Sequence, residues 1–173
     1  MTRLYKAGAF VADTWVSLDD RTTLPIDGRA IVPLARWRAE LAELISAGLP
    51  IGVAVGPGEA VDPRTDNIDR LGVIAIAFAK FTDGRGYSQA RMLREQAGYK
   101  GELRATGEIL LDQVPLLERC GFDALAVSHA PTIAALERGH LPAIAQVYQP
   151  TGARPTAAAW LSRRSTTLVT ERT

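Results

Sequence analysis

Short, continuous runs of apolar residues recur along the middle of this chain, and segments with helical periodicity separate the later ones. The clearest runs are IGVAV at 51–55 and GVIAIAF at 72–78, whose Val- and Ile-rich composition is typical of strands buried on both faces. Later helical segments end at Gly98 and Gly121. Strands that alternate with helices connect by right-handed crossovers and form a mostly parallel sheet. The pattern therefore predicts an α/β fold.

We expect about five to six strands with flanking helices. The predicted strands are AIV at 30–32 and the segments 51–55, 72–78, 101–106, 123–128 and 144–149. A complete eight-fold β/α barrel normally needs about 200 residues or more, and this chain has 173. The length therefore favours an open sheet or an incomplete β/α barrel.

The chain is expected to form one domain, since its length suits a single hydrophobic core. We assign residues 1–150 to this α/β domain. Within it, residues 1–28 are predicted to form a small antiparallel hairpin, and residues 29–150 carry the β/α repeats. Residues 151–173 are rich in Thr, Ala, Arg and Ser and lose apolar periodicity, so we expect a flexible tail.

Composition and charge exclude several classes of protein. The net charge is only +1, which argues against a nucleic-acid-binding protein with a strongly basic face. The most apolar stretch, residues 71–81, is too short to span a bilayer. Cys120 is the only cysteine and the N-terminus lacks the apolar core of a secretory signal, so a cytoplasmic location is expected.

The most informative segment is KFTDGRGYSQARMLRE, residues 80–95. It follows the most apolar run and opens a helix, which places it at the carboxyl edge of the sheet, where open α/β folds bind ligands. Gly84 and Gly86 would let backbone amides turn toward a bound group, and a helix N-terminus adds partial positive charge. Arg85 offers a planar set of donors suited to phosphate, sulfate or carboxylate. The segment therefore predicts an anion- or partner-binding loop.

The next predicted strand carries Arg104, which could share a rim with Lys80 and Arg85, because strands adjacent in sequence are usually adjacent in space. The predicted binding residues are Lys80, Thr82, Gly84, Arg85, Gly86, Tyr87, Ser88 and Arg104. An alternative is a structural turn in which Asp83 caps the helix. In that case Arg85, Lys80 or Arg104 would instead pair with neighbouring carboxylates.

Asp83 and Glu108 are the candidate proton-transfer residues. Glu108 and Asp112 are four residues apart and could share one helical face as acid and base, although two solvated carboxylates would show the same spacing. Cys120, just before Gly121, is expected to be a buried packing group and not a nucleophile.

No cofactor site is evident. His129, His140 and Cys120 are too few for a structural zinc site or an iron–sulfur cluster. A dinucleotide fingerprint needs a third glycine where Gln89 stands, so an NAD-type cofactor is not expected.

Four sequence blocks resemble the bacterial family called domain of unknown function 934. They are KFTDGRGYSQARMLRE, YKGELRATGEILLDQ, RCGFDALAV and VYQP, and the similarity runs over about residues 30–150. The family has no established activity, but the resemblance implies a link to sulfur metabolism. Its members are typically encoded among genes for assimilatory sulfite reductase and are often labelled oxidoreductases. Ala79 departs from the proline that commonly precedes the Lys-Phe-Thr-Asp block.

Two functions of different classes follow from these observations. The first is an accessory or coupling protein in assimilatory sulfate and sulfite reduction, whose loop binds a small anion or an acidic surface of sulfite reductase or another protein of that process. The second is a small enzyme acting on a sulfur-containing or phosphorylated metabolite. In the enzyme, Arg85 and Arg104 would bind the anion and Asp83 or Glu108 would move protons.

Three tryptophans bear on the oligomeric state, because each could lie either in the core or at an interface. Trp15, Trp37 and Trp160 could complete the core of a monomer or bury against a second copy in a homodimer.

Overall fold

The computed structural model describes residues 1–79 and 84–142. Eight strands form one sheet in the order β2-β1-β8-β7-β6-β5-β4-β3. Six strands run parallel to one another: β3 (Trp15–Ser17), β4 (Arg29–Pro33), β5 (Ile51–Val55), β6 (Leu71–Phe78), β7 (Glu102–Gly107) and β8 (Ala124–Val127). β1 (Arg3–Lys6) pairs antiparallel with β8, and β2 (Ala9–Val11) pairs antiparallel with β1 at the edge of the sheet.

The mostly parallel α/β fold is confirmed, but the predicted number of strands is wrong. The sheet has eight strands instead of five to six, because the N-terminal segment contributes three strands to it. The strand predicted at 144–149 and the tail predicted at 151–173 lie outside the described residues.

The N-terminal segment contains the expected hairpin, followed by a parallel strand. β1 and β2 pair through a turn at Ala7 and Gly8, whose φ angles of 51° and 84° are the positive values that a tight two-residue hairpin requires. β3 leaves this hairpin and pairs in parallel with β4. β1 also pairs with β8, so it occupies the edge where a further β/α strand would join.

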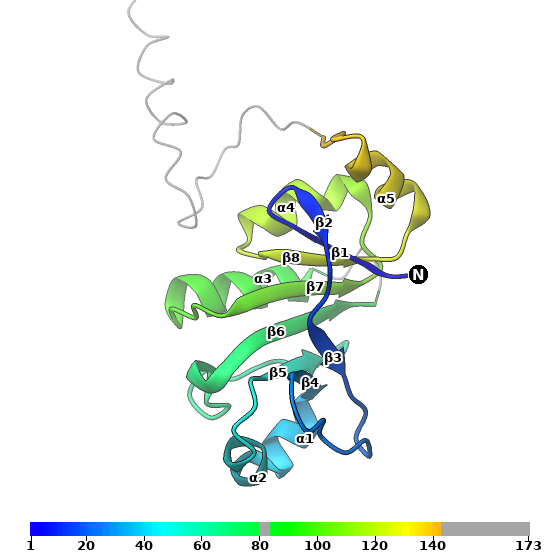
Figure 1. Cartoon of the computed structure of the whole chain (residues 1–173). Helices are drawn as coiled ribbons and strands as arrows, with labels where there is room; N and C mark the ends of the chain where they lie inside the picture. Colours follow the sequence, from blue (N-terminus) through cyan, green and yellow to red (C-terminus); the bar gives the residue numbers. More distant parts are fainter. Residues whose placement is uncertain (80–83, 143–173) are drawn as a thin grey trace, which may run out of the picture.

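The helices alternate with the strands from β4 onward. They are α1 (Leu34–Ala39), α2 (Leu41–Ser46), α3 (Arg85–Arg91), α4 (Val114–Arg119) and α5 (Ala130–Glu137). A π-helical turn, η2 (Met92–Gln96), extends α3, and two short 3-10 turns are η1 (Ile68–Arg70) and η3 (Leu111–Gln113). Figure 1 shows α3 and α4 behind the strands, with the N-terminal segment in front. In the described part of the chain, no helix is long and apolar enough to cross a membrane.

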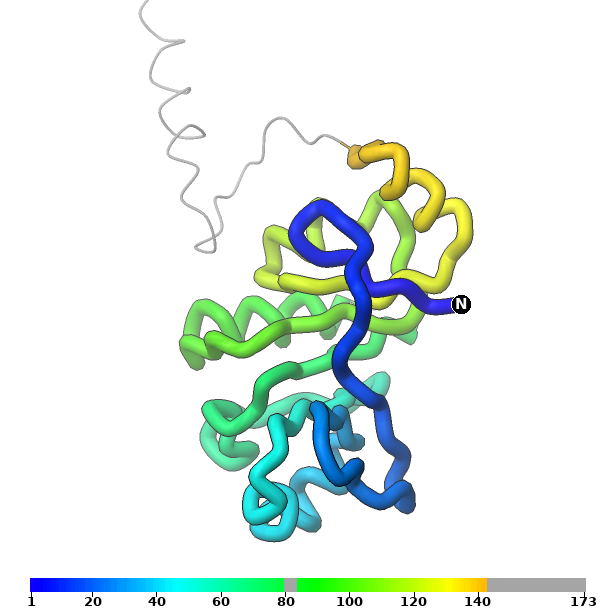
Figure 2. Tube along the Cα trace, in the orientation of Figure 1, coloured from blue at the N-terminus to red at the C-terminus, as the bar shows by residue number. Residues whose placement is uncertain are grey.

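The sheet curls because its two edge strands are joined by a very short connection. β2 and β3 are the outermost strands, yet only residues 12–14 separate them. Eight strands laid flat would place the edges roughly 34 Å apart, at about 4.8 Å per neighbouring pair. The connection from Val11 to Trp15 reaches at most about 14 Å. The Cα trace in Figure 2 shows this connection running across the front of the sheet.

The curled sheet is an incomplete barrel. Within residues 1–79 and 84–142 no strand pairing joins β2 to β3. The structure therefore has one outer face, covered by helices, and one inner face, crossed by residues 12–14.

Strand alternation assigns residues to these two faces. On the outer face, Ile74, Ile76 and Phe78 of β6 join the main hydrophobic core, and Phe78 packs against Tyr87 of α3 with ring centroids 5.0 Å apart. The inner face carries the intervening residues of the same strands. Register places Ala75 beside Arg104, and Arg104 beside Ala124.

Of the three tryptophans, Trp37 is part of the core of the monomer and is not available to an interface with a second copy. It is 1% exposed, and its indole N–H donates to the backbone oxygen of Asp66 at 2.7 Å. The side chain of Asp66 is 2% exposed and accepts two hydrogen bonds from Arg38, both 2.7 Å long. The Arg38 hydrogen bonds hold the pKa of the Asp66 carboxyl below its usual range. Trp15 is partly buried, and Trp160 lies outside the described residues.

Replacing Asp66 by Asn should lower the free energy of unfolding by about 2 kcal/mol at pH 7, because a buried charged partner of Arg38 is lost. The Asp66 pKa is lowered by folding, so its stabilising contribution is present above the unfolded pKa of about 3.9 and disappears as pH falls through the folded pKa. The difference between wild type and Asp66→Asn, measured by urea unfolding, should therefore shrink below about pH 4. Asp69→Asn, at an exposed carboxylate, is the control. Equal stabilities of Asp66→Asn and wild type at pH 7 would contradict the prediction.

Candidate functional site

The carboxyl ends of the parallel strands β4 to β8 lie at one edge of the curled sheet, which we call the carboxyl rim. Its described parts are residues 56–60 after β5, Gly107 at the end of β7 with Glu108 after it, and Ser128 and His129 after β8. The start of α3 reaches the same rim because β6 leads into it.

Small side chains surround the inner face at the rim. Ala54, Ala77, Thr106 and Ala126 come from four successive strands and are each only partly buried. One step below them, Ala75, Arg104 and Ala124 are 4%, 3% and 0% exposed. The inner face is therefore solvated at the rim and carries a buried cation beneath it.

Arg85 lies at the carboxyl rim, as the sequence predicted from the apolar run and the helix start. It is exposed, and its Nη1 lies 3.7 Å from where a Cβ on Gly58 would be. Arg85 therefore contacts the loop after β5 from the start of α3. In that loop the carboxylate of Glu59 accepts a hydrogen bond from the Gly56 amide at 2.6 Å.

The glycines of the loop do not act through unusual backbone angles, contrary to the sequence-based argument. Gly84 has φ −75°, and Gly86 lies within α3. Gly86 instead allows close packing, because an added Cβ would lie 2.7 Å from the Phe78 ring. The described residues therefore give Gly86 a packing role that the sequence analysis did not predict.

Tyr87 also faces the core, and Ser88 faces solvent. The Tyr87 hydroxyl accepts a hydrogen bond from the Gln113 amide at 2.9 Å, and burial raises its pKa. Ser88 is exposed, and its backbone N–H points to the Gly84 oxygen at 3.4 Å. The other predicted loop residues, Lys80, Thr82 and Asp83, lie outside the described residues.

Arg104 does not share the rim with Arg85, which corrects the sequence-based expectation. Its guanidinium turns toward the interior of the curled sheet and pairs with two carboxylates. Nη1 and Nη2 donate to Asp13 at 2.7 and 3.1 Å, and Nε donates to Glu102 at 2.9 Å. Arg104 therefore follows the alternative given by the sequence analysis, in which it pairs with carboxylates of the protein.

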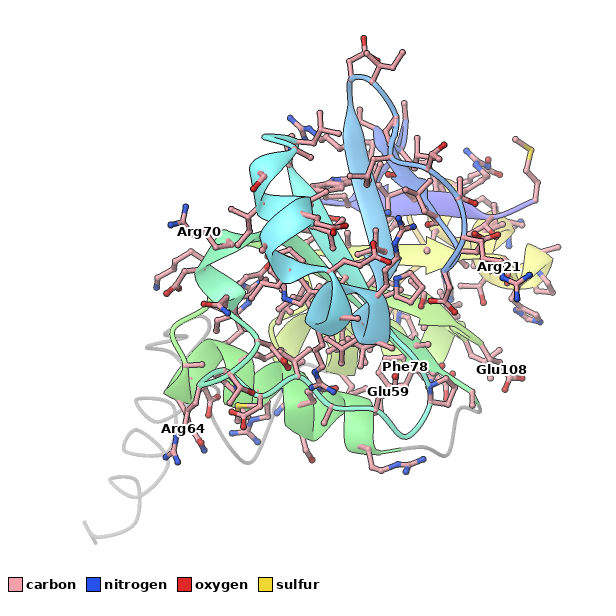
Figure 3. All side chains as sticks on the ribbon, turned by 90° about the horizontal axis from the view of Figure 1, so that it is seen from below. Arg21, Glu59, Arg64, Arg70, Phe78 and Glu108 are labelled. Atoms are coloured by element: carbon pink, nitrogen blue, oxygen red, sulfur yellow. The ribbon has the colours of Figure 1, made fainter. Side chains whose placement is uncertain are left out.

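Glu108 is exposed at the end of β7, and Figure 3 shows its side chain extending away from the sheet. Its amide donates to the Phe78 oxygen at 3.0 Å, which ties the ends of β6 and β7 together. Gly107 makes this approach possible, because its φ is +92° and a Cβ there would lie 2.3 Å from that oxygen. The proposed helical pairing of Glu108 with Asp112 is wrong, since Asp112 lies in the separate turn η3.

Cys120 and His129 have local structural roles. Cys120 is 6% exposed, and burial raises the pKa of its thiol, so it is a packing group as predicted. His129 precedes α5 and its Nδ1 lies 2.9 Å from the Thr132 hydroxyl. In the described part of the chain, no group of three or more His, Cys, Asp or Glu side chains could hold a metal ion.

Sequence reasoning missed two elements of this region. The loop Gly56-Pro57-Gly58-Glu59 could have been found, because it directly follows a buried strand. Asp13 could not have been found, since its partner Arg104 is 91 residues away in the chain.

A family model for bacterial proteins of unknown function, DUF934, matches residues 52–159, more than half of the chain. The chain belongs to the DUF934 family. The match includes β5 to β8 and the helices between them, and therefore most of the carboxyl rim. Searches of curated proteins and of solved structures find no match.

The two glycines at the start of α3 allow a matched test of packing. Gly86→Ala should lower the free energy of unfolding by about 1–3 kcal/mol, because its methyl group would meet the Phe78 ring. Gly84→Ala should change it by less than about 0.5 kcal/mol, since nothing lies within 4 Å of its Cβ position. Urea unfolding of both variants checks this, and equal effects would show that Gly86 does not serve packing.

Proposed function

We propose that this DUF934 protein is an accessory or coupling protein of assimilatory sulfite reduction in the cytoplasm. In this role its carboxyl rim binds a small anion or an acidic surface of sulfite reductase. The observation that carries the proposal is the position of Arg85, an exposed arginine held at the carboxyl rim against Gly58.

The chemistry of Arg85 suits this role. A guanidinium presents paired N–H donors in one plane, which match two oxygens of a sulfur oxyanion or a carboxylate. Arg85 is the first residue of α3 and lies beside Gly58 in the loop after β5, so a ligand or partner bound there would contact both α3 and that loop. The resemblance of this chain to proteins encoded beside sulfite reductase supports the choice of partner.

A small enzyme acting on a sulfur-containing or phosphorylated metabolite is the second candidate. The observation that favours it is the position of Glu108, an exposed carboxylate joined by its backbone to the end of β6. Glu108 or Asp83 would then supply the proton-transfer group, with Arg85 as the anion-binding group.

The accessory role is tested by sulfite turnover of the purified reductase and its native electron donor, with and without an equal concentration of this protein. The wild type should raise the rate. Arg85→Ala should need at least about tenfold more protein for the same effect, since one charge-assisted contact is lost. Arg70→Ala is the matched control, because Arg70 is exposed at the amino end of β6 and away from the rim. No rate increase and no complex with wild type would reject the accessory role.

The enzyme candidate is tested with the isolated protein on a panel of sulfur and phosphate metabolites. If turnover is found, Asp83→Asn or Glu108→Gln should reduce kcat by about 100-fold or more, as expected for loss of a general acid or base. Full activity in both variants, each shown to be folded by circular dichroism, would exclude these two residues as proton carriers.

A further inference from the structure

We propose that the inner face of the curled sheet is a binding site for a small oxyanion, and that Asp13 occupies the ligand position on Arg104 in the structure described. An external anion with two coplanar oxygens would replace the Asp13 carboxylate when the connection between β2 and β3 moves aside. This inference rests on the anion-binding function proposed above and assigns that function a second, interior position.

Arg104 already binds a ligand of the proposed kind. Two of its nitrogens donate to the two oxygens of the Asp13 carboxylate, the paired geometry with which a guanidinium binds a carboxylate or a sulfur oxyanion. The Arg104 side chain is 4% exposed, so its charge is enclosed by protein. Glu102 pairs with Nε and Nη2 of Arg104, whereas Nη1 donates to Asp13. Loss of the Asp13 carboxylate would therefore take away the acceptor of a buried, charged N–H group, which is costly.

The charges on the inner face require an anion when Asp13 leaves. Lys6 contacts Glu102 at 2.6 Å, and Glu102 also contacts Arg104 at 2.8 Å. Two cations, Lys6 and Arg104, are therefore balanced by two carboxylates, Glu102 and Asp13. Without Asp13 the group would have a net charge of +1, and a small anion would restore the balance.

Asp13 lies on an exposed segment, and its carboxylate accepts hydrogen bonds from Arg104 and from the backbone amide of Trp15, the latter 3.0 Å long. Residues 12–14, which we call the strap, are all exposed. The strap joins two strands of three residues each, and each of these strands pairs on one side only. Exposed segments with few backbone hydrogen bonds open at a lower free energy than the core. The Asp13 side chain is itself 40% exposed, so solvent ions reach it.

The side chains beside Arg104 on the inner face are small. Its neighbours in the register are Ala75 and Ala124, and the partly buried Ala77, Thr106 and Ala126 lie between them and the rim. Small side chains on the neighbouring strands present little steric obstruction to a compact anion of two to four oxygens that approaches the guanidinium. The ligand class is therefore a small carboxylate or a sulfur oxyanion such as sulfite or sulfate.

The strap sets the affinity of this site by competition. A carboxylate attached to the same chain acts at an effective concentration in the millimolar range or above, so it weakens the binding of an external anion. Removing the Asp13 carboxylate should therefore strengthen anion binding by at least about tenfold while it lowers the stability of the anion-free protein.

The test is chemical rescue of Asp13→Ala with sodium formate, which supplies the missing carboxylate, and in parallel with sodium sulfate. In the full chain we expect Asp13→Ala to have a lower Tm than wild type, and formate to raise this Tm more than sodium chloride at equal ionic strength. By calorimetric titration, formate or sulfate should bind the variant at least about tenfold more tightly than wild type. Asp20→Ala, at another exposed carboxylate of the N-terminal segment, should show neither effect.

The inference is overturned if formate and sulfate affect Asp13→Ala no more than chloride does. If Asp13→Ala does not fold alone, formate-dependent folding measured by circular dichroism supports the inference. If Asp13→Ala does not fold even with formate, the same calorimetric titration is made with Asp13→Asn. An anion affinity equal to that of wild type in Asp13→Asn would overturn the inference.

Arg85→Ala separates this inference from the proposed function. Rescue of Asp13→Ala by formate should survive the additional change Arg85→Ala, because Arg85 lies at the rim and Arg104 in the interior. Rescue without any effect of the protein on sulfite reductase would reject the accessory role and leave the interior site. An effect on the reductase that depends on Arg85, without rescue of Asp13→Ala by formate, would support the accessory role and reject the interior site.

Discussion

The ion pair between Arg104 and Asp13 fixes the connection between the two edge strands to the middle of the curled sheet. Asp13 lies on the strap between the edge strands β2 and β3, and Arg104 lies in β7, near the middle of the sheet. No backbone pairing joins β2 to β3 among the described residues, so the sheet is not closed by hydrogen bonds between strands as it is in a complete barrel. The ion pair instead attaches the segment between these two strands to the inner face. The cost of burying Arg104 is offset only while an anion remains beside it.

The outer face depends on a different constraint: two glycines at which the backbone packs so closely against Phe78 that no Cβ atom would fit. Gly86 brings α3 onto the Phe78 ring, and Gly107 brings the end of β7 onto the Phe78 oxygen. Both contacts exclude a Cβ atom, so they define the distance between the strand ends and the first turn of α3. The carboxyl rim, with Arg85 on its outer side and Glu108 at the end of β7, follows from this packing. A binding loop placed on a rigid sheet edge is the usual arrangement in α/β proteins.

The rim and the interior present the same cation chemistry in two environments. Arg85 is exposed, where salt screens its interactions and a partner surface can reach it. Arg104 is buried, where charge interactions are screened less than at the surface. The DUF934 match spans both arginines, whereas the strap that carries Asp13 lies before the matched residues.

Local sequence determined the α/β alternation, the buried strands β5 and β6, the helix ends at Gly98 and Gly121, and the position of Arg85 at the rim, because each depends on neighbouring residues. It also indicated that Cys120 is buried. Only the tertiary structure decided that β1, β2 and β3 join the sheet and that Arg104 pairs with Asp13 and not with a ligand at the rim. These outcomes depend on contacts between segments far apart in the chain. Apolar periodicity reports which face of a strand is buried, but it does not report which distant charge will lie opposite a buried arginine.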